Sequence, residues 1–281
     1  MSEPPADAEL DARTVAARRV LLDALEALRD HRNALVLVGA QAVYLRSEQA
    51  TLTASAYTFD GDLGLDPRLL GDDPRLEQLM RAAGFKLNNG REPGVWVSRN
   101  PADSTSGVEV DLLVPASLVA GRRAAHLDPH DRLAARTAEG LELALHDNDL
   151  MPIPGLGGDP RRIEIRVAGT AALLVAKAHK LTDRLAADRT HRVKAKDAAD
   201  CYRLMTVTNP YTARDRFQAL LDDPTTTKPT EAGLDRLHTL FATPNSAGAD
   251  LAVTALTLAG PSEDEIRDGT ALFVSQLPHG T

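Results

Sequence analysis

Apolar and polar residues alternate strictly between Tyr57 and Asp66, and this period of two predicts a half-buried β-strand. One side of the predicted strand is apolar, with Gly61 interrupting it; its large residues are Tyr57, Phe59, Leu63 and Leu65. The other side is polar and carries Thr58, Asp60, Asp62 and Asp66. The alternation therefore predicts a strand with one face in the core and two neighbouring carboxylates, Asp60 and Asp62, projecting from the other.

The hydrophobic pattern divides the rest of the chain into two parts. Up to residue 167, short apolar runs alternate with helical patterns and with turn residues, which predicts a mixed sheet with flanking helices. The predicted strands are 34–38, 57–66, 85–87, 94–98, 108–114, 141–145 and 162–167. The predicted helices in this part are 13–32, 41–46, 74–83 and, as a short one, 131–137. A loop rich in Gly and Pro is predicted over 152–160.

From residue 168 onward the pattern is helical, with prolines between the helices. The predicted helices are 169–188, 195–208, 211–222, 229–242, 246–258 and 262–275. We therefore expect an α/β (α+β) protein with a disordered tail at 1–12, an α/β domain at 13–167 and a helical domain at 168–281.

Composition limits the function classes. The 281 residues are 43% hydrophobic and 26% charged, which is typical of a soluble globular protein. One cysteine, Cys201, excludes an internal disulfide and a cysteine-rich zinc site, and it favours a reducing cytoplasm. The acidic start has no signal-peptide pattern, and no apolar stretch is long enough to span a membrane. A net charge of −8 and 4% aromatic residues argue against a general nucleic-acid coat or a stacking platform.

The candidate chemistry begins with three carboxylates. Asp60 and Asp62 share a strand face, and Asp111 lies on the strand 108–114, opposite that strand's apolar side. Like charges held close together repel unless a cation lies between them, and hard oxygen ligands suit Mg²⁺ or Mn²⁺. Asp111 would bind a second metal ion or act as a base. A solvated strand face rich in Asp is the alternative interpretation.

The strand 34–38 ends at Gly39-Ala40, directly before a predicted helix. Backbone N–H groups at such a helix start can bind phosphate, although a tight strand-to-helix connection would use glycine for packing alone. The carboxylate strands and this turn resemble the nucleotidyltransferase superfamily with a DNA-polymerase-β-like fold. That resemblance implies a nucleoside triphosphate held between Gly39-Ala40 and the Asp pair.

The later motifs resemble the AbiEii/AbiGii toxin family within that superfamily. Thr58-Phe-Asp60-Gly-Asp62 matches its strand motif, Lys177 its Ala-Lys helix, and Asp197 with Asp200 its Asp-x-x-Asp helix. The turn departs from the family pattern, because Ala40 replaces the second Gly or a Ser. The resemblance implies Lys177 near the phosphates, substrate-binding roles for Thr58, Asp197 and Asp200, tRNA as acceptor in some members, and a partner antitoxin.

Basic residues gather around Lys177 in an otherwise acidic chain. Lys177, Lys180 and Arg184 are spaced i, i+3 and i+7, so they share a helix face. This face is either solvated or binds a triphosphate or an RNA backbone. Asp197 and Asp200 either form helix-surface ion pairs or orient Lys177.

The sequence thus favours a metal-dependent nucleotidyltransferase that moves a nucleotide from a triphosphate to a hydroxyl, such as a tRNA 3′ end, as the toxin of a toxin–antitoxin pair. Transfer to a small molecule of the antibiotic type and a catalytically inactive binding protein remain as alternatives.

Overall fold

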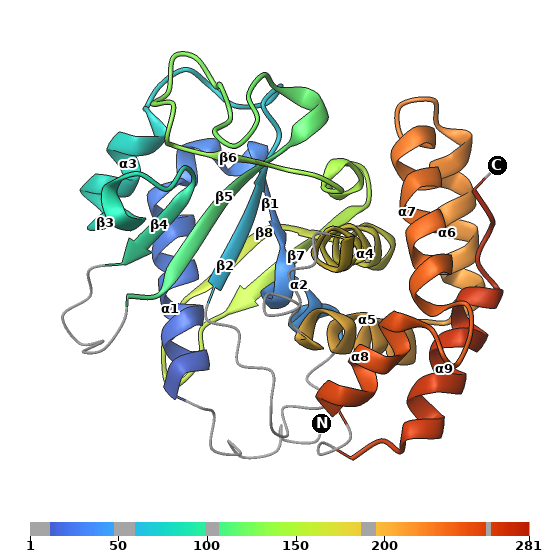
Figure 1. Ribbon diagram of the computed structural model, residues 1–281. Helices are drawn as coiled ribbons and strands as arrows, with labels where there is room; N and C mark the ends of the chain where they lie inside the picture. The colour runs from blue at the N-terminus through green and yellow to red at the C-terminus, as the bar shows by residue number, and fades with distance from the viewer. Residues whose placement is uncertain (1–11, 48–59, 99–106, 187–194, 257–259, 281) are drawn as a thin grey trace.

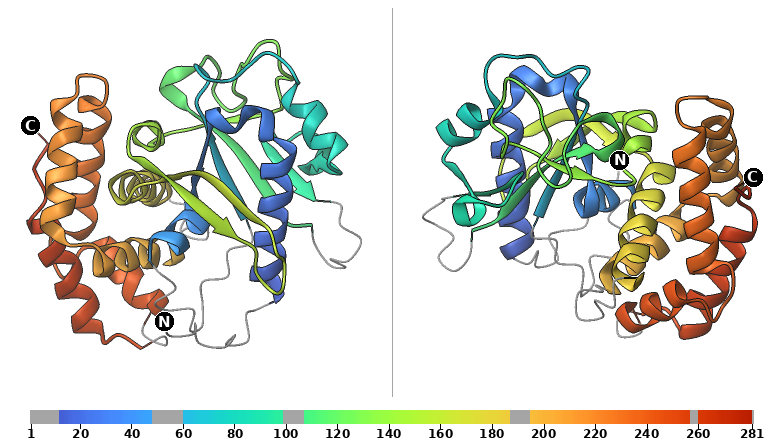
Figure 2. Two further views of the ribbon diagram at one scale, coloured as in Figure 1. Left: turned by 180° about the vertical axis from the view of Figure 1, so that it is seen from behind. Right: turned by 45° about the horizontal axis from the view of Figure 1, so that its top comes forward.

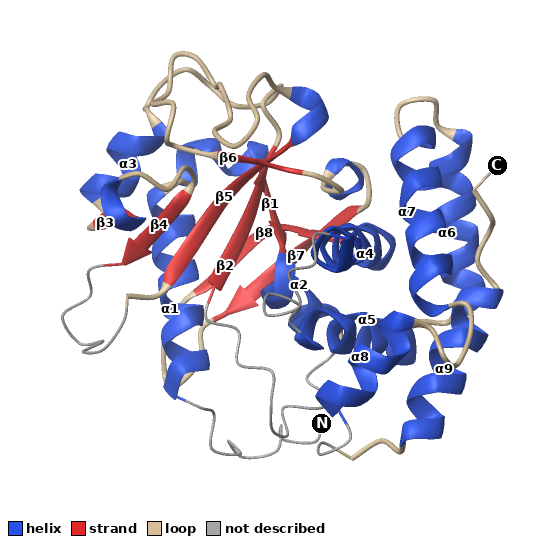
Figure 3. Cartoon of the chain, viewed as in Figure 1, coloured by secondary structure: helices blue, strands red, loops and turns tan. Residues whose placement is uncertain are grey.

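The computed structural model describes residues 12–47, 60–98, 107–186, 195–256 and 260–280. Within these ranges the chain forms an eight-stranded mixed sheet followed by a group of helices. Figure 3 shows the division, because the labelled strands lie together on one side of the molecule and the later helices on the other. The predicted fold class, a mixed α/β part followed by a helical part, is confirmed.

The α/β part contains eight strands and three α-helices among the described residues. The strands are β1 Leu35–Val38, β2 Asp60–Leu65, β3 Phe85–Leu87, β4 Val95–Ser98, β5 Glu109–Pro115, β6 Arg136–Ala138, β7 Asn148–Pro154 and β8 Arg162–Ala168. The helices are α1 Ala12–Ala27, α2 Gly39–Arg46 and α3 Leu76–Ala82, with short 3-10 turns at Arg29–Ala34, Asn88–Gly90, Ala116–Leu118 and Glu142–Leu145.

The sheet has the strand order β3-β4-β5-β2-β1-β8-β7, and β6 pairs with β5 outside this path. The pairs β2–β5, β1–β8 and β5–β6 are parallel, and the other pairs are antiparallel. β4 pairs with β5 up to Asp111, and β6 pairs with it from Leu113 onward. The edge of β5 is therefore shared by two short strands that meet beside Asp111.

Helices cover both faces of the sheet. α1 lies on one face, as the two opposite views show, and α2 and α4 lie on the other (Figures 1 and 2). On the α1 face, a Cβ atom on Gly61 would lie 3.2 Å from Leu21. Because side chains alternate along a strand, Asp60 and Asp62 project to the opposite face, where α2 and α4 lie.

The helical part begins at α4 Thr170–Ala186 and continues with α5 Ala195–Val207, α6 Pro210–Asp222, α7 Thr227–Phe241, α8 Ala247–Leu256 and α9 Glu263–Ser275. Local sequence explains several starts. Asn209 caps α6 before Pro210, and Ser262 with Glu265 forms a capping box at α9. No helix in the described ranges is long and apolar enough to cross a membrane.

The buried apolar side chains form one continuous cluster that includes strand residues such as Leu37 and helix residues such as Leu174 and Leu237. α4 packs against α2, α5 and α7 and so joins the sheet to the later helices. The predicted boundary at 167/168 coincides with the end of β8. The division into two domains stays a prediction.

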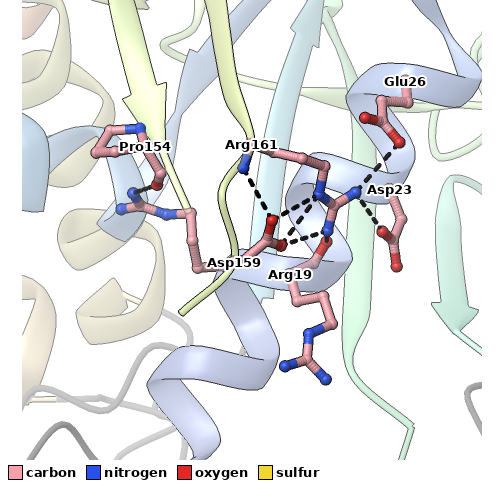
Figure 4. A network of polar contacts seen from close by, with 7 residues as sticks. Arg19, Asp23, Glu26, Pro154, Asp159 and Arg161 are labelled. Atoms are coloured by element: carbon pink, nitrogen blue, oxygen red, sulfur yellow. Dashed lines mark hydrogen bonds and ion pairs between the residues drawn. The ribbon is translucent and has the colours of Figure 1, made fainter. Parts of the chain in front are cut away.

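A polar network fixes the β7–β8 hairpin to α1 (Figure 4). Arg161, just before β8, donates to Asp159 at 2.6 Å, to Asp23 at 2.7 Å and to Glu26 at 3.2 Å. Asp159 holds the pKa of Arg161 above its usual value, chiefly through these hydrogen bonds. The hairpin at one edge of the sheet is thereby anchored to the helix that covers the sheet.

Three predicted elements were wrong. Residues 131–137 do not form a helix, because their last two residues belong to β6. Residues 141–145 form a 3-10 turn rather than a strand, and the predicted loop at 152–160 begins inside β7. Pro152 and Pro154 are turn signals in the sequence, yet an edge strand tolerates proline because its outward N–H needs no partner.

Candidate functional site

The three predicted carboxylates lie on one face of the sheet. In the parallel pair β2–β5, Asp62 is in register with Asp111, and Asp60 is in register with Glu109. Registered residues of neighbouring strands project to the same side, so all four acidic side chains share the face turned toward α2 and α4. The structure therefore brings together Asp60, Asp62 and Asp111, as the sequence predicted, and adds Glu109 beside them.

Asp111 is the most buried member of this group, with 8% of its surface exposed. Its Oδ2 accepts a hydrogen bond from Nη2 of Arg136, whereas its buried Oδ1 has no hydrogen-bond partner within the described part of the chain. Burial and the charge of Asp62 raise the pKa of Asp111 to about 7; Arg136 opposes the rise and Asp60 adds to it. The site thus contains a buried carboxylate with one oxygen bound by Arg136 and one that has no partner among the described residues.

The Gly39-Ala40 turn contacts this group directly. Gly39 has a φ of +68°, and a Cβ atom there would lie 1.9 Å from Oδ2 of Asp62. Glycine is required twice over, because its backbone is left-handed and because the Asp62 carboxylate occupies the space of a side chain. α2 starts at Gly39, and its N-cap residue Val38 provides no side-chain cap, so the first N–H groups of the helix lie near the carboxylates without a cap from that residue.

A buried arginine on α1 holds α2 in place. Arg18 donates twice to Oε1 of Gln41, at 2.9 and 3.0 Å, and once to the carbonyl oxygen of Pro154, at 2.8 Å. Burial lowers the pKa of Arg18, which lacks a carboxylate among these partners. Because Gln41 directly follows Gly39-Ala40, this contact fixes the turn relative to α1 and to β7.

Lys177 is enclosed in a buried ion-pair network between α4 and α5. Its Nζ donates to Oδ1 of Asp197 at 2.8 Å and to Oδ2 of Asp200 at 2.7 Å, and the residue is only 4% exposed. Burial alone would lower the pKa of Lys177, but Asp200 and Asp197 hold it above its usual value. The family-matched Lys and Asp residues therefore lie together. The predicted role of Lys177 at the phosphates stays a prediction.

Asp197 also binds the two other basic residues of the predicted helix face. Arg184 donates to Oδ2 of Asp197 at 2.6 Å, and Nζ of Lys180 lies 3.5 Å from Oδ1. The side chain of Lys180 is 44% exposed. Partial burial and Lys177 lower the pKa of Lys180, whereas Asp197 and Asp62 raise it. Lys180 is thus an accessible cation between the ion-pair network and the sheet carboxylates.

Asp197 and Asp200 are not helix-surface residues, because both are buried. Asp200 does accept from Arg203, three residues along α5, at 3.0 Å. The network therefore matches the alternative in which the two aspartates orient Lys177. Thr58, the remaining predicted substrate-binding residue, lies outside the described residues.

The carboxylates on the sheet face are the candidate ligands for a divalent metal ion. Among the described residues, no group of three or more His, Cys, Asp or Glu side chains is arranged to hold a metal ion. The chemistry of the donors nevertheless suits one: three carboxylates share a face, they repel one another, and Asp111 has a buried oxygen to which no described residue donates. Asp60, Asp62 and Asp111 thus fit Mg²⁺ or Mn²⁺ in ligand type.

Sequence reasoning missed Arg136 and Arg18, because each acts on a residue far away in the chain. His179 is buried on α4 against Gly140, where a Cβ atom would lie 2.6 Å from the imidazole ring.

A surface hollow of about 730 Å³ lies along β3 and is lined by Lys86, Asn88 and neighbouring residues. None of the site carboxylates lines this hollow.

No protein-family model matches the sequence, and no curated protein matches it either. Among solved structures, the fold is similar to the crystal structure of an antigenic nucleotidyltransferase-like protein from Paracoccidioides brasiliensis. The two sequences are 16% identical, the match covers 87% of this chain and 93% of that chain, and the TM-score is 0.44. What this chain does has therefore to be inferred from the residues of its own sheet face.

Proposed function

We propose that this protein is a metal-dependent nucleotidyltransferase that transfers a nucleotide from a nucleoside triphosphate to a hydroxyl acceptor. The observation that carries the proposal is the register of β2 and β5, which places Asp62 beside Asp111 on the face where the uncapped start of α2 lies. Acidic oxygen ligands and a phosphate-binding helix start, side by side, suit a metal-bound triphosphate.

Each part of the site has a role in this proposal. Asp60, Asp62 and Asp111 hold the metal ion, and the N–H groups at Gly39 and Ala40 bind phosphate oxygens. Mg²⁺ bound there would neutralise phosphate charge and lower the pKa of the attacking hydroxyl. In the transfer, the acceptor hydroxyl loses its proton to an ionised carboxylate of the site or to water, its oxygen forms a bond to the α-phosphorus, and the bond from the α-phosphorus to pyrophosphate breaks. Lys180 is exposed and lies close enough to Asp62 for the two charges to interact. In this proposal its ammonium group stabilises the departing phosphates.

We propose an RNA 3′ end, such as that of tRNA, as the acceptor and a toxin role opposed by an antitoxin. The support is the match of Lys177, Asp197 and Asp200 to the toxin-family motifs, together with the basic residues Lys180 and Arg184 beside them. Growth arrest on expression, relieved by a neighbouring gene, would test the toxin role. Labelled products formed with total RNA or with small hydroxyl compounds would identify the acceptor.

A nucleotide-binding protein without catalysis is the second candidate, and the pairing of Arg136 with Asp111 favours it. A cation already neutralises the third carboxylate in the metal-free protein. This candidate predicts that a triphosphate binds but that no label moves to any acceptor.

Thermal unfolding in the presence of each of the four triphosphates tests the proposal. A ligand that binds only the folded state raises the unfolding temperature by mass action. We expect one or two triphosphates to stabilise the wild type only with Mg²⁺ or Mn²⁺, and Asp62→Asn to abolish the effect. Two results would contradict the proposal: a triphosphate that stabilises the wild type without metal, or no stabilisation by any triphosphate under any condition.

A further inference from the structure

Arg136 on β6 is in register with Leu113, two residues beyond Asp111 on β5, so its side chain projects to the carboxylate face of the sheet. β4 ends its pairing with β5 at Asp111, and β6 begins at Leu113. Gly94, with a φ of +70°, lies at this junction, and a Cβ atom there would lie 2.5 Å from the backbone nitrogen of Arg136 and 2.9 Å from its Cγ. The absence of a side chain at Gly94 thus leaves room for Arg136 beside Asp111.

The contact between Arg136 and Asp111 leaves polar atoms without partners on both sides. Nη2 of Arg136 donates to Oδ2 of Asp111, but Nε of Arg136 and Oδ1 of Asp111 are buried and bind nothing among the described residues. Arginine and carboxylate groups pair most favourably through two parallel hydrogen bonds. This pair is therefore incomplete, and it leaves one donor suited to an anion and one acceptor suited to a cation.

The position of Arg136 makes an exchange of partners feasible. Its side chain is 37% exposed, whereas Asp111 is nearly buried, so the guanidinium lies on the open side of the carboxylate. Asp62 is in register with Asp111, and the start of α2 lies against Asp62. A phosphate bound at the start of α2 would therefore lie on the same sheet face as the Arg136 guanidinium, with Asp62 and Asp111 between them.

We propose that Arg136 is a phosphate-binding residue of the nucleotide site: it neutralises Asp111 in the free protein and moves its contact to the triphosphate when Asp111 binds a metal ion. The inference rests on the proposed function and adds a specific residue to it. Arginine suits this exchange because its charge is permanent and its planar group matches phosphate geometry.

The test compares wild type, Arg136→Gln and Arg136→Lys, with Arg123→Gln as the matched control. Arg123 is also paired with a carboxylate, Glu92 at 3.2 Å, but its side chain is 74% exposed. Two affinities are measured for each protein: Mn²⁺ alone, by electron paramagnetic resonance, and non-cleavable α,β-methylene triphosphates with Mn²⁺, by calorimetry. Thermal unfolding in metal-free buffer verifies that each variant is folded.

We expect Arg136→Gln to weaken binding of the triphosphate analogue about 10-fold or more, because a contact between charged groups is lost. Its affinity for Mn²⁺ alone should be equal to that of the wild type or higher, because a competing cation is gone. Arg136→Lys should lose less analogue affinity, and Arg123→Gln should match the wild type. If Arg136→Gln is unfolded, the comparison of Arg136→Lys with wild type decides: weaker analogue binding at unchanged Mn²⁺ affinity supports the proposal.

Unchanged analogue binding in Arg136→Gln would overturn the inference while leaving the proposed function intact. Equal loss of Mn²⁺ and analogue affinity would also overturn it, because Arg136 would then only hold Asp111 in position. If the wild type binds Mn²⁺ but none of the analogues, the proposed function and the inference both fail.

Discussion

Asp62 lies so close to Gly39 that a Cβ atom on the glycine would lie 1.9 Å from Oδ2 of the carboxylate. The contact joins the end of β1 to the middle of β2 and places a carboxylate at the first turn of α2. It directly links the two motifs that the sequence singled out, the glycine turn and the Asp-x-Asp strand.

The first prediction concerns this contact. Gly39→Ala should lower the free energy of unfolding through a strained φ and through displacement of Asp62, and it should weaken Mn²⁺ binding. Gly158→Ala is the control, because Gly158 also has a positive φ, +82°, but open space around it. We expect Gly39→Ala to cost at least about 1 kcal/mol more than the control in urea unfolding. Equal costs and unchanged Mn²⁺ affinity would mean that Asp62 moves aside freely.

The second prediction concerns pH. Asp111 has a pKa of about 7 in the folded protein against 3.8 as a free side chain, so the folded state binds more protons between these values. The stability from protonated Asp111 is fully present below about pH 4 and is lost as the pH rises through about 7.

We therefore expect the unfolding free energy of the wild type in chelator to fall between about pH 4 and 7 by roughly 1–4 kcal/mol. Asp111→Asn should reduce this slope, because it cannot ionise. Urea unfolding at several pH values in chelator measures both proteins. The same slope in both would show that Asp111 is not the group responsible.

The third prediction separates stability from chemistry at Lys177. Lys177→Ala leaves Asp197 and Asp200 buried without their shared cation, so it should destabilise the fold by roughly 3–5 kcal/mol. A loss of activity in this variant would then not by itself place Lys177 at the substrate. If the variant keeps wild-type stability and loses turnover, Lys177 acts on the substrate instead.

The fourth prediction concerns Lys180. Its contact with Asp197 is long and its side chain is half exposed, so Lys180→Ala should change the unfolding free energy by less than about 1 kcal/mol. The same variant should weaken metal–triphosphate binding and reduce its dependence on salt, since one charge facing the site is removed. Calorimetry at two salt concentrations measures this effect, and identical affinities and salt slopes in both proteins would leave Lys180 as a merely solvated residue.

The sequence predicted what depends on local pattern. The helices from α4 to α9 follow the apolar periodicity of the sequence, prolines or caps mark several of their starts, and β2 and β5 alternate cleanly. The sequence-based prediction failed where the local pattern is ambiguous. Pro152 and Pro154 indicated a loop where the edge strand β7 lies, and the short apolar run at 141–145 fits a strand and a 3-10 turn equally well.

The positions of the site carboxylates could be predicted from the sequence, but those of the site cations could not. Asp60 and Asp62 share a strand face by simple alternation, so the sequence alone predicts that they lie side by side. Arg136 meets Asp111 only because β6 joins β5 just beyond the end of β4. That pairing is set by the whole sheet and leaves no motif in the sequence. The enclosure of Lys177 likewise depends on how α4 packs against α5.

Transfer of label from α-³²P triphosphates tests the central claim most directly. Wild type, Asp60→Asn, Asp62→Asn and the control Asp268→Asn, an exposed carboxylate on α9, are incubated with total RNA or small hydroxyl compounds, with and without Mg²⁺. We predict metal-dependent labelling of one acceptor class by wild type and Asp268→Asn, and a loss of about 100-fold or more in the two site variants. Labelling at the wild-type rate by Asp60→Asn and Asp62→Asn, or no labelling by the wild type, would contradict the account.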